Sequence, residues 1–285
     1  DFKNWNVYDG VSTDSWAASV GSDGQWTGAI NYLGYPTFFK EERIHRIYPS
    51  SAGAHQVQET VCSGVQKGSW RSLCVCNEIL FYKGRTNVYA YDGSQPTAIS
   101  DAFGDVNYID ARAGAVRNKY YISMKNAAVA DSNYALFCYD AKRGIWHRED
   151  STKALMFSAC DDDLFFIDEN AGKLCTVYGS EGTEEQSMEW YAESGVQNYS
   201  EVGHKYISRF NFRVQLPAGS TMHLYMRYDD GLWEDRGSFT GKGLDTYLLP
   251  VIPRRCDHLQ FKLTGTGPFK LFGISKVYEQ GSDEG

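Results

Sequence analysis

A loose repeat of about 40 residues runs through the first 180 residues of this 285-residue chain. Each copy has an apolar strand, a polar turn and a second strand rich in aromatic residues. Taking Tyr48, Tyr91, Tyr139 and Tyr178 as equivalent positions gives steps of 43, 48 and 39 residues. Units of roughly 40 to 50 residues that form small sheets are typical of propeller blades. The repeat therefore predicts a β-propeller-like domain over residues 1–180.

The turns inside these units have the chemistry of hairpin connections. Residues 83–87, 140–144 and 168–172 supply Gly, Asn and Asp, which tolerate the positive φ angles of tight turns. Residues 5–10 resemble residues 88–93, so we interpret them as the last strand of a blade that begins upstream. We expect either that this upstream segment has been removed or that the sequence is a fragment. Four copies and this remnant predict about five blades, in a propeller that is either partial or complete.

The second part of the chain has a different pattern. Residues 179–187 are small and acidic, as expected for a linker, and a second domain is predicted over residues 187–285. Apolar and polar residues alternate strictly in residues 210–216, 222–228 and 259–263, which indicates strands with one buried face. About six strands in 100 residues predict an antiparallel β-sandwich of jelly-roll kind. The predicted fold class is thus all-β.

Composition excludes several classes of function. The 20 Tyr, 15 Phe and 7 Trp favour strands, and the net charge of −8 argues against a nucleic-acid partner, which requires a basic surface. The chain has no run of about 18 apolar residues, so no membrane insertion is expected. Seven cysteines cannot all pair, and most lie in strand-like segments. We interpret them as buried thiols of a protein made in a reducing cytosol.

Three acidic or thiol-containing motifs are candidates for metal or catalytic sites. Residues 161–163 are three aspartates that could bind Ca²⁺, but they lack the spacing of a calcium loop and suit a hairpin turn better. Cys74 and Cys76 would point to one face of a strand, yet no further ligand follows at zinc-site spacing. Residues 147–150, His-Arg-Glu-Asp, could exchange protons, or could form a polar blade-end strand behind a packed Trp146. We favour the strand, and no metal or cofactor is predicted.

The sequence contains no recognisable catalytic motif. Glycosidases need two carboxylates roughly 5 to 10 Å apart, which a five-bladed propeller could supply from its inner strands. The chain has 36 acidic residues, and the sequence singles out none of them. The sequence therefore predicts a protein that is not an enzyme.

Four residues of the second domain are candidates for binding. Trp233 follows a loop of Asp229, Asp230 and Gly231 and could stack on a sugar ring. Arg254, Arg255 and His258 concentrate positive charge at the entry to a strand. Arginine pairs well with carboxylates, so these residues could serve a subunit interface or internal ion pairs.

Two parts of the chain carry a resemblance to a known group of proteins. Residues 134–140 with 144–150, and residues 252–258 with 278–283, resemble structural proteins of tailed bacteriophages and prophages of gut Firmicutes. This resemblance implies a virion protein of the head-tail or tail apparatus, similar to stabilisation proteins, that forms a homo-oligomer and contacts other virion proteins. A tail adhesin that binds a cell-surface glycan is the alternative, and a propeller glycoside hydrolase is the third hypothesis.

Overall fold

The computed structural model describes residues 20–50, 55–129, 133–179, 189–198, 205–250 and 254–280. Within these ranges the chain is built from strands, with two 3₁₀ turns as the helical elements. The chain forms two compact units, residues 1–181 and 182–285. The prediction of an all-β fold, with propeller-type blades followed by a β-sandwich, is confirmed. The predicted strand at residues 5–10 and the linker at residues 180–187 lie outside the described residues.

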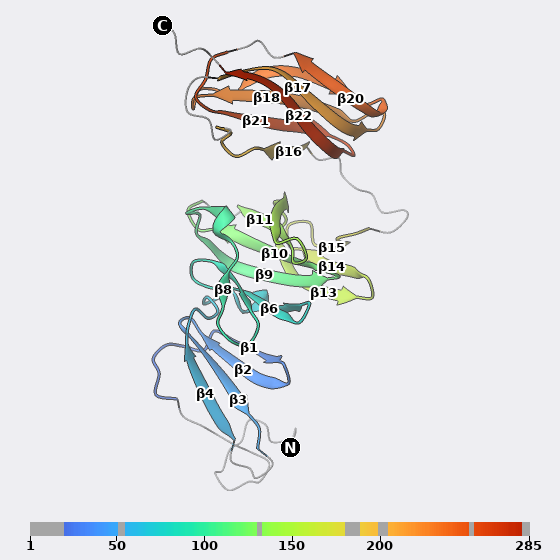
Figure 1. Cartoon of the computed structure of the whole chain (residues 1–285). Coiled ribbons are helices and arrows are strands. Elements are labelled where there is room, and N and C mark those ends of the chain that lie inside the picture. The colour runs from blue at the N-terminus through green and yellow to red at the C-terminus, as the bar shows by residue number, and fades with distance from the viewer. Residues whose placement is uncertain are drawn as a thin grey trace. The chain divides into compact units, whose positions relative to one another are not determined.

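The described residues of unit 1 form four antiparallel sheets that follow one another along the chain (Figure 1). The first sheet comprises β1 (Gly28–Tyr32), β2 (Tyr35–Lys40), β3 (Arg43–Tyr48) and β4 (Gln56–Val61). The second comprises β5 (Cys74–Cys76), β6 (Ile79–Lys83), β7 (Val88–Tyr91) and β8 (Thr97–Ala98), with the 3₁₀ turn η1 (Trp70–Ser72) before it and η2 (Asp101–Phe103) after it. The third comprises β9 (Tyr108–Val116), β10 (Lys119–Asn126), β11 (Tyr134–Asp140) and β12 (Ile145–Asp150). The fourth comprises β13 (Ala154–Cys160), β14 (Asp163–Asp168) and β15 (Lys173–Thr176).

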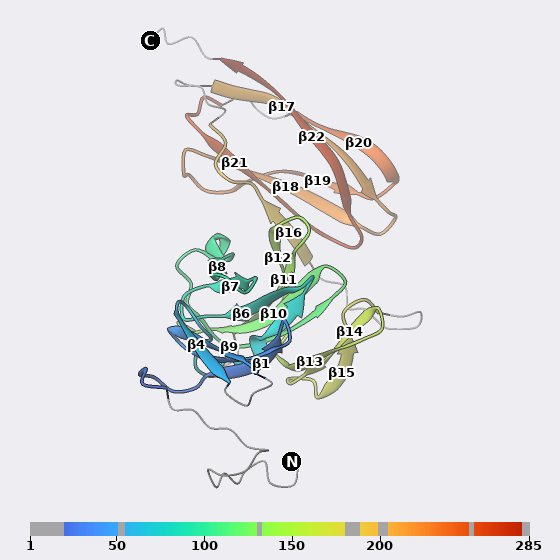
Figure 2. The ribbon, with the colours of Figure 1, turned by 60° about the horizontal axis from the view of Figure 1, so that its bottom comes forward.

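These sheets are arranged as propeller blades. In each sheet, consecutive strands are neighbours, and the first strands of successive sheets contact one another, β5 with β9 and β9 with β13. Figure 2 shows β9 next to the fourth sheet, β13 to β15. The repeat predicted from the sequence is the blade itself. Tyr48, Tyr91 and Tyr139 lie at or next to the end of the third strand of their sheets, and Tyr178 lies two residues beyond β15. The three predicted hairpin turns connect β6 to β7, β11 to β12 and β14 to β15, as expected.

Apolar side chains fill the spaces between successive blades. Phe39 and Tyr82 belong to one buried cluster formed by the first and second sheets, and Phe81 and Tyr120 belong to another formed by the second and third. Between the third and fourth sheets the backbones approach closely at Gly114. A Cβ atom there would lie 2.4 Å from the Cβ of Phe157. Only glycine fits this contact without displacing the neighbouring blade.

Unit 2 is an antiparallel sandwich of two sheets. One sheet contains β16 (Glu189–Glu193), β21 (Leu259–Thr266), β18 (Thr221–Tyr228) and β19 (Glu234–Thr240) in spatial order. The other contains β20 (Gly243–Pro250), β17 (Lys205–Leu216) and β22 (Lys270–Gln280). The side chains predicted to face inward from residues 210–216 and 222–228 are buried, and they form the core with Leu259 and Leu263.

Two further observations concern the whole described chain. In the ranges that the structure describes, no helix has the length and apolar character needed to cross a membrane. The seven cysteines are free thiols, and Cys76, Cys138 and Cys256 are buried.

Candidate functional site

A polar cavity of about 740 Å³ opens at one end of the first three sheets of unit 1. Its walls come from the β2–β3 turn, the segment between β4 and η1, the β6–β7 turn, and the loop from η2 to β9. Strands of a meander alternate in direction. Turns between second and third strands therefore emerge at the same end as the connections from one sheet to the next. The cavity is thus a consequence of the blade topology, and it is formed by loops, where binding residues commonly lie.

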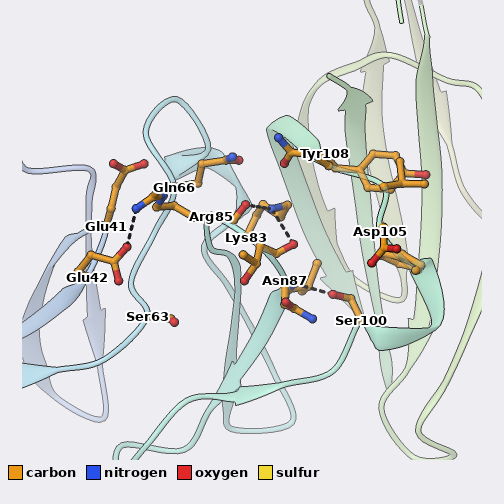
Figure 3. A pocket seen from close by; sticks show the side chains of 16 residues that line it. Glu41, Glu42, Ser63, Gln66, Lys83, Arg85, Asn87, Ser100, Asp105 and Tyr108 are labelled. Atoms are coloured by element: carbon orange, nitrogen blue, oxygen red, sulfur yellow. Dashed lines mark hydrogen bonds and ion pairs between the residues drawn. The ribbon is translucent and has the colours of Figure 1, made fainter. Parts of the chain in front are cut away.

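Carboxylate side chains line two sides of this cavity. Glu41 and Glu42 occupy the β2–β3 turn, and Asp105 lies in the loop between η2 and β9 (Figure 3). Figure 3 shows the two glutamates at one side and Asp105 with Tyr108 at the other, with Lys83 between them. The cavity therefore presents acidic side chains from two different blades to a common space.

Glu41 is fixed by the backbone around it. Its Oε1 accepts a hydrogen bond from the Lys67 N–H at 3.0 Å, and its carbonyl accepts one from the Gly64 N–H at 2.8 Å. The neighbouring Glu42 pairs with the Arg85 guanidinium at 3.0 Å. Both side chains of that pair are exposed, so the pair contributes little to stability. Of the two carboxylates, that of Glu41 is the one that accepts a hydrogen bond from the main chain, whereas that of Glu42 pairs with a side chain.

A buried lysine forms the floor of the cavity. The Lys83 ammonium donates to the carbonyl oxygens of Gly84, Arg85 and Thr86, and its side chain is 1% exposed. Burial lowers the pKa of Lys83 to about 8. The three carbonyl acceptors explain how a charged group is tolerated there, since a buried ammonium requires hydrogen-bond partners. Lys83 therefore shapes the β6–β7 turn from within.

The opposite wall is anchored by aromatic packing. Phe103 stacks on Phe137 with ring centroids 4.4 Å apart and meets Tyr108 edge to face at 5.8 Å. The loop after Phe103 carries Asp105, whose carboxylate makes no hydrogen bond or ion pair within the described part of the chain. An exposed carboxylate without a partner, on a short loop between two packed aromatic residues, is free to bind a ligand.

The cavity combines groups that suit a polyhydroxylated ligand. Carboxylates accept hydrogen bonds from hydroxyl groups, guanidinium and amide groups donate to them, and an aromatic ring can stack against the apolar face of a sugar. The lining supplies all three kinds of group: Glu41, Glu42, Gln66, Arg85, Asn87, Asp105, Asn107 and Tyr108. Two carboxylates in one cavity can also exchange protons with a bound substrate.

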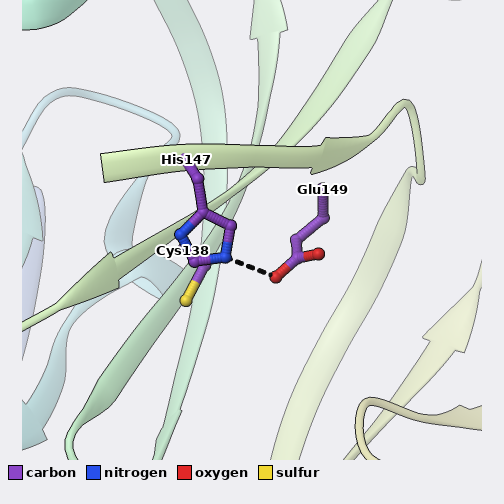
Figure 4. Close-up of side chains that lie close together, drawn as sticks. All are labelled: Cys138, His147 and Glu149. Carbon is purple, nitrogen blue, oxygen red and sulfur yellow. Dashed lines mark hydrogen bonds and ion pairs between the residues drawn. The ribbon is translucent and has the colours of Figure 1, made fainter. Parts of the chain in front are cut away.

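A second cluster lies on the third blade. Cys138 of β11 and His147 of β12 are directly opposed in the strand register, and Glu149 follows on β12 (Figure 4). The His147 Nε2 and the Glu149 Oε1 are 2.8 Å apart. Hydrogen bonding to Cys138, together with that to Glu149, raises the pKa of His147 to about 10, and the same bond to His147 lowers the pKa of Glu149. Residues 147–150 form the edge strand β12 with Trp146 packed inward, as predicted, but His147 and Glu149 also interact.

The other motifs weighed from the sequence have structural roles. Asp161 and Asp162 form the β13–β14 turn, as predicted. Asp163 begins β14, and its carboxylate accepts hydrogen bonds from the Leu164 and Tyr178 N–H groups. Cys74 and Cys76 lie on β5, and within the described residues they are not part of a cluster of metal-binding side chains.

Trp233 lies in the loop immediately before β19, and its ring is covered by two cations. The Arg227 guanidinium lies 4.9 Å from the ring centroid and the Lys262 ammonium lies 4.6 Å from it. The proposed role of Trp233 as a ligand contact stays a prediction.

Arg254, Arg255 and His258 lie near the start of β21. Arg254 and His258 contact acidic side chains. Arg254 pairs with Glu234 at 2.6 Å, and Arg255 is exposed. His258 faces Asp229, Asp230 and Asp257, and its hydrogen bond to Asp230 is the main cause of a raised pKa. These contacts show intrachain pairing for Arg254 and His258, and a role of the three residues in a subunit interface stays a prediction.

The sequence does not single out the cavity carboxylates, and it gives His147 and Glu149 as a candidate pair without connecting them to Cys138. The blade repeat could have predicted the cavity. When each blade is assigned four strands, the β2–β3 turn and the η2–β9 loop lie at the same end of the blades. The predicted turn at residues 140–144 could have placed Cys138 beside His147, because a hairpin with this turn pairs residue 138 with residue 147. No pattern in the sequence marks Asp105.

Comparisons with known proteins give similar structures and no sequence relatives. No protein-family model matches the chain, and no curated protein matches it. An exo-β-1,3-galactanase from Phanerochaete chrysosporium, in complex with β-1,3-galactotriose, is similar at 7% identity and a TM-score of 0.30, over 84% of this chain and 78% of that one. A glycoside hydrolase family 43 arabinoxylan arabinofuranohydrolase from Bacillus subtilis is similar at 8% identity and a TM-score of 0.24, over 88% and 78%.

These comparisons correct two expectations. The similar structures are glycoside hydrolases, so the predicted virion structural protein of the head-tail or tail apparatus, and the prediction that the chain is not an enzyme, are both wrong. Propeller folds serve many unrelated functions. A structural repeat, and a resemblance that included no catalytic residue, therefore did not identify the function. At such low identities and TM-scores, the matches do not transfer a reaction or a substrate to this chain. The chemistry of the cavity is therefore the basis for a functional proposal.

Proposed function

We propose that unit 1 is a carbohydrate-active unit that binds a glycan segment in the polar cavity and hydrolyses its glycosidic bond. The observation that carries this proposal is the placement of Glu41 and Asp105 on different walls of one cavity, on turns that belong to different blades. Glycoside hydrolysis needs two carboxyl groups flanking the scissile bond, one to donate a proton to the leaving oxygen and one to act as base or nucleophile.

The surroundings of the two groups suggest their roles. Glu41 accepts a hydrogen bond from the Lys67 N–H, and this bond holds its carboxylate in one position in the cavity. We therefore assign Glu41 as the base or nucleophile. Asp105 lines the opposite wall and makes no hydrogen bond or ion pair within the described residues, so its carboxyl group is available to the leaving oxygen of a substrate. We assign Asp105 as the proton donor.

The remaining polar lining would hold the sugar. Arg85 and Asn87 lie on the β6–β7 turn, whose shape is set by the buried Lys83. Because Lys83 holds this turn in one conformation, its side chains lose little conformational entropy when a ligand binds. They can therefore orient hydroxyl groups with a small loss of binding free energy. Tyr108 offers an aromatic face on the opposite wall. The cavity thus provides both orientation and acid–base chemistry.

The experiment is a hydrolysis screen. The purified full chain is incubated with a panel of oligosaccharides and polysaccharides, and the release of reducing ends is measured. We expect cleavage of at least one substrate class by the wild type. E41Q and D105N should each reduce kcat by about 10²- to 10⁴-fold, the usual contribution of a general acid or base.

The control is D162N, which makes the same chemical change in the exposed β13–β14 turn. It should retain wild-type activity. Absence of cleavage across the panel, or equal activity of the wild type, E41Q and D105N, would overturn the proposal.

A further inference from the structure

We propose that Cys138, His147 and Glu149 form a binding site for a divalent transition-metal ion, with Zn²⁺ as the best match. The site lies on the edge of the third blade, and its three residues are separate from the cavity lining. The proposal is independent of the proposed hydrolytic function. It rests on the convergence of three different metal-binding side chains in one place.

The local backbone explains this convergence. Cys138 and His147 are register partners on the hairpin β11–β12, so their side chains lie on one face of the sheet. The register then shifts between Leu136 and Phe137, which leaves Glu149 without a partner on β11. Glu149 lies on the same face as His147 because side chains two residues apart on a strand point to the same side. Here Glu149 lies against the imidazole of His147.

The donor atoms suit zinc. A sulfur, a ring nitrogen and a carboxylate oxygen all lie within 4.8 Å of one another. Zinc binds these atoms at about 2.0 to 2.3 Å in tetrahedral geometry, so small side-chain rotations bring all three into range. Three protein ligands leave a fourth position for water or a ligand, which is the pattern of a reactive rather than a structural zinc site. The mixed sulfur, nitrogen and oxygen set disfavours Ca²⁺ and Mg²⁺, which prefer oxygen atoms alone.

A nucleophilic thiol is the competing interpretation of the same residues. Cysteine nucleophiles activated by histidine must reach a substrate, and they are partially exposed. Cys138 is 0% exposed, and it belongs to the buried cluster between the third and fourth blades. The open side of the cluster is instead formed by His147 and Glu149, whose side chains are 44% and 38% exposed. A metal ion can enter from that side and reach the sulfur, whereas a larger substrate cannot.

Neighbouring strands support the position of the sulfur. Tyr121 on β10 is the register partner of Cys138 on its other side, and its hydroxyl bonds to that of Tyr178 at 3.3 Å. Cys138 is therefore held between a buried tyrosine and a histidine on the rim. Binding of the ion would replace the thiol proton and the hydrogen bond between His147 and Glu149, because metal ligands must be deprotonated.

The test measures metal binding to the full chain, kept reduced and stripped of metal with a chelator. Zn²⁺ is titrated against a chromophoric competitor, and Co²⁺ is added in a separate experiment to record its absorption spectrum. We expect one high-affinity Zn²⁺ per wild-type chain and a thiolate-to-Co²⁺ charge-transfer band. H147Q and E149Q should each weaken Zn²⁺ binding by at least about tenfold, since even partners beyond the direct ligands change affinity by 10- to 100-fold.

The design includes controls for folding and for the other thiols. His147 and Glu149 lie on an exposed edge strand, so their variants should fold, which circular dichroism verifies. C138S should abolish the charge-transfer band, whereas C160S, which alters an exposed thiol outside the cluster, should leave it unchanged. The proposal is overturned if the wild type binds no Zn²⁺, if H147Q and E149Q bind it as tightly as the wild type, or if the Co²⁺ spectrum lacks the thiolate band.

Discussion

Phe103 stacks on Phe137 with ring centroids 4.4 Å apart at an interplanar angle of 29°. Phe137 lies on β11, in the middle of the third blade, whereas Phe103 ends the 3₁₀ turn η2. This contact joins the loop that carries Asp105 to a rigid sheet. The position of the proposed proton donor thus depends on packing between aromatic rings, two residues away from it in the sequence.

Replacing Phe103 by alanine should therefore loosen one wall of the cavity. We expect F103A to lower the free energy of unfolding by about 2 kcal/mol, as is typical for loss of a partly buried aromatic contact. Urea denaturation followed by fluorescence measures this change. L174A removes a side chain that is 71% exposed on β15 and should change stability by less than about 0.5 kcal/mol. Equal stabilities of F103A and L174A would contradict this account of the wall.

Gly114 should tolerate no side chain. G114A places a methyl group 2.4 Å from the Phe157 Cβ, so β9 and β13 would have to move apart. We expect a loss of about 1 to 3 kcal/mol, the usual cost of overpacking a core. G21A is the matched control because a Cβ at Gly21 meets nothing within 4 Å. Thermal denaturation of both variants measures the difference, and a melting temperature of G114A equal to that of G21A would show that the blades are not closely packed there.

Lys83 should make stability depend on pH in the alkaline range. Its pKa in the folded chain is lowered to about 8 by burial, below the unfolded value of about 10.4. Between these values the unfolded chain binds more protons, so stability rises with pH. The charged form therefore destabilises the folded chain below about pH 8, and this penalty is relieved by about pH 10.

The comparison with K83M isolates this effect. The difference in unfolding free energy between wild type and K83M should shift by about 1 to 3 kcal/mol in favour of the wild type from pH 8 to pH 10.5. Other titrating groups cancel in the difference. Parallel curves for the two proteins would indicate that Lys83 keeps an ordinary pKa.

His258 should titrate above the usual range for histidine. Its hydrogen bond to Asp230 is the main cause of its raised pKa, and Asp257 and Asp229 add to it. NMR titration of the imidazole should give a midpoint above about 6.5 in the wild type and a lower one in D230N. D162N, in the other unit, should leave the midpoint unchanged. A wild-type midpoint at or below 6.5 would mean that the acidic contacts are absent in solution.

Much of the fold follows from local patterns in the sequence. The alternation of Met222, Leu224 and Met226 with polar neighbours correctly places one face of β18 in the core, because the side-chain period of a strand is two. The strand β19 was missed, since its sequence Glu-Asp-Arg-Gly-Ser-Phe-Thr is polar and carries a glycine. It is an edge strand with little burial, so composition gives it no apolar signature.

The site was harder to predict, because it depends on contacts between distant segments. Glu41 and Asp105 are 64 residues apart in the sequence, and they share a cavity only because two loops emerge at the same end of the blades. His147 and Glu149 share one face of β12 because they are two residues apart, but the meeting of both with Cys138 depends on the register of the hairpin β11–β12. Local propensities fix the strands, whereas the chemistry depends on their arrangement in space.

The most direct test of the central proposal is a crystal structure of the D105N variant with an oligosaccharide that the wild type cleaves. The proposal predicts a sugar bound between Glu41 and residue 105, with its glycosidic oxygen within hydrogen-bond distance of the substituted side chain. A substrate bound elsewhere on the chain, with the cavity between the first three blades empty, would contradict it.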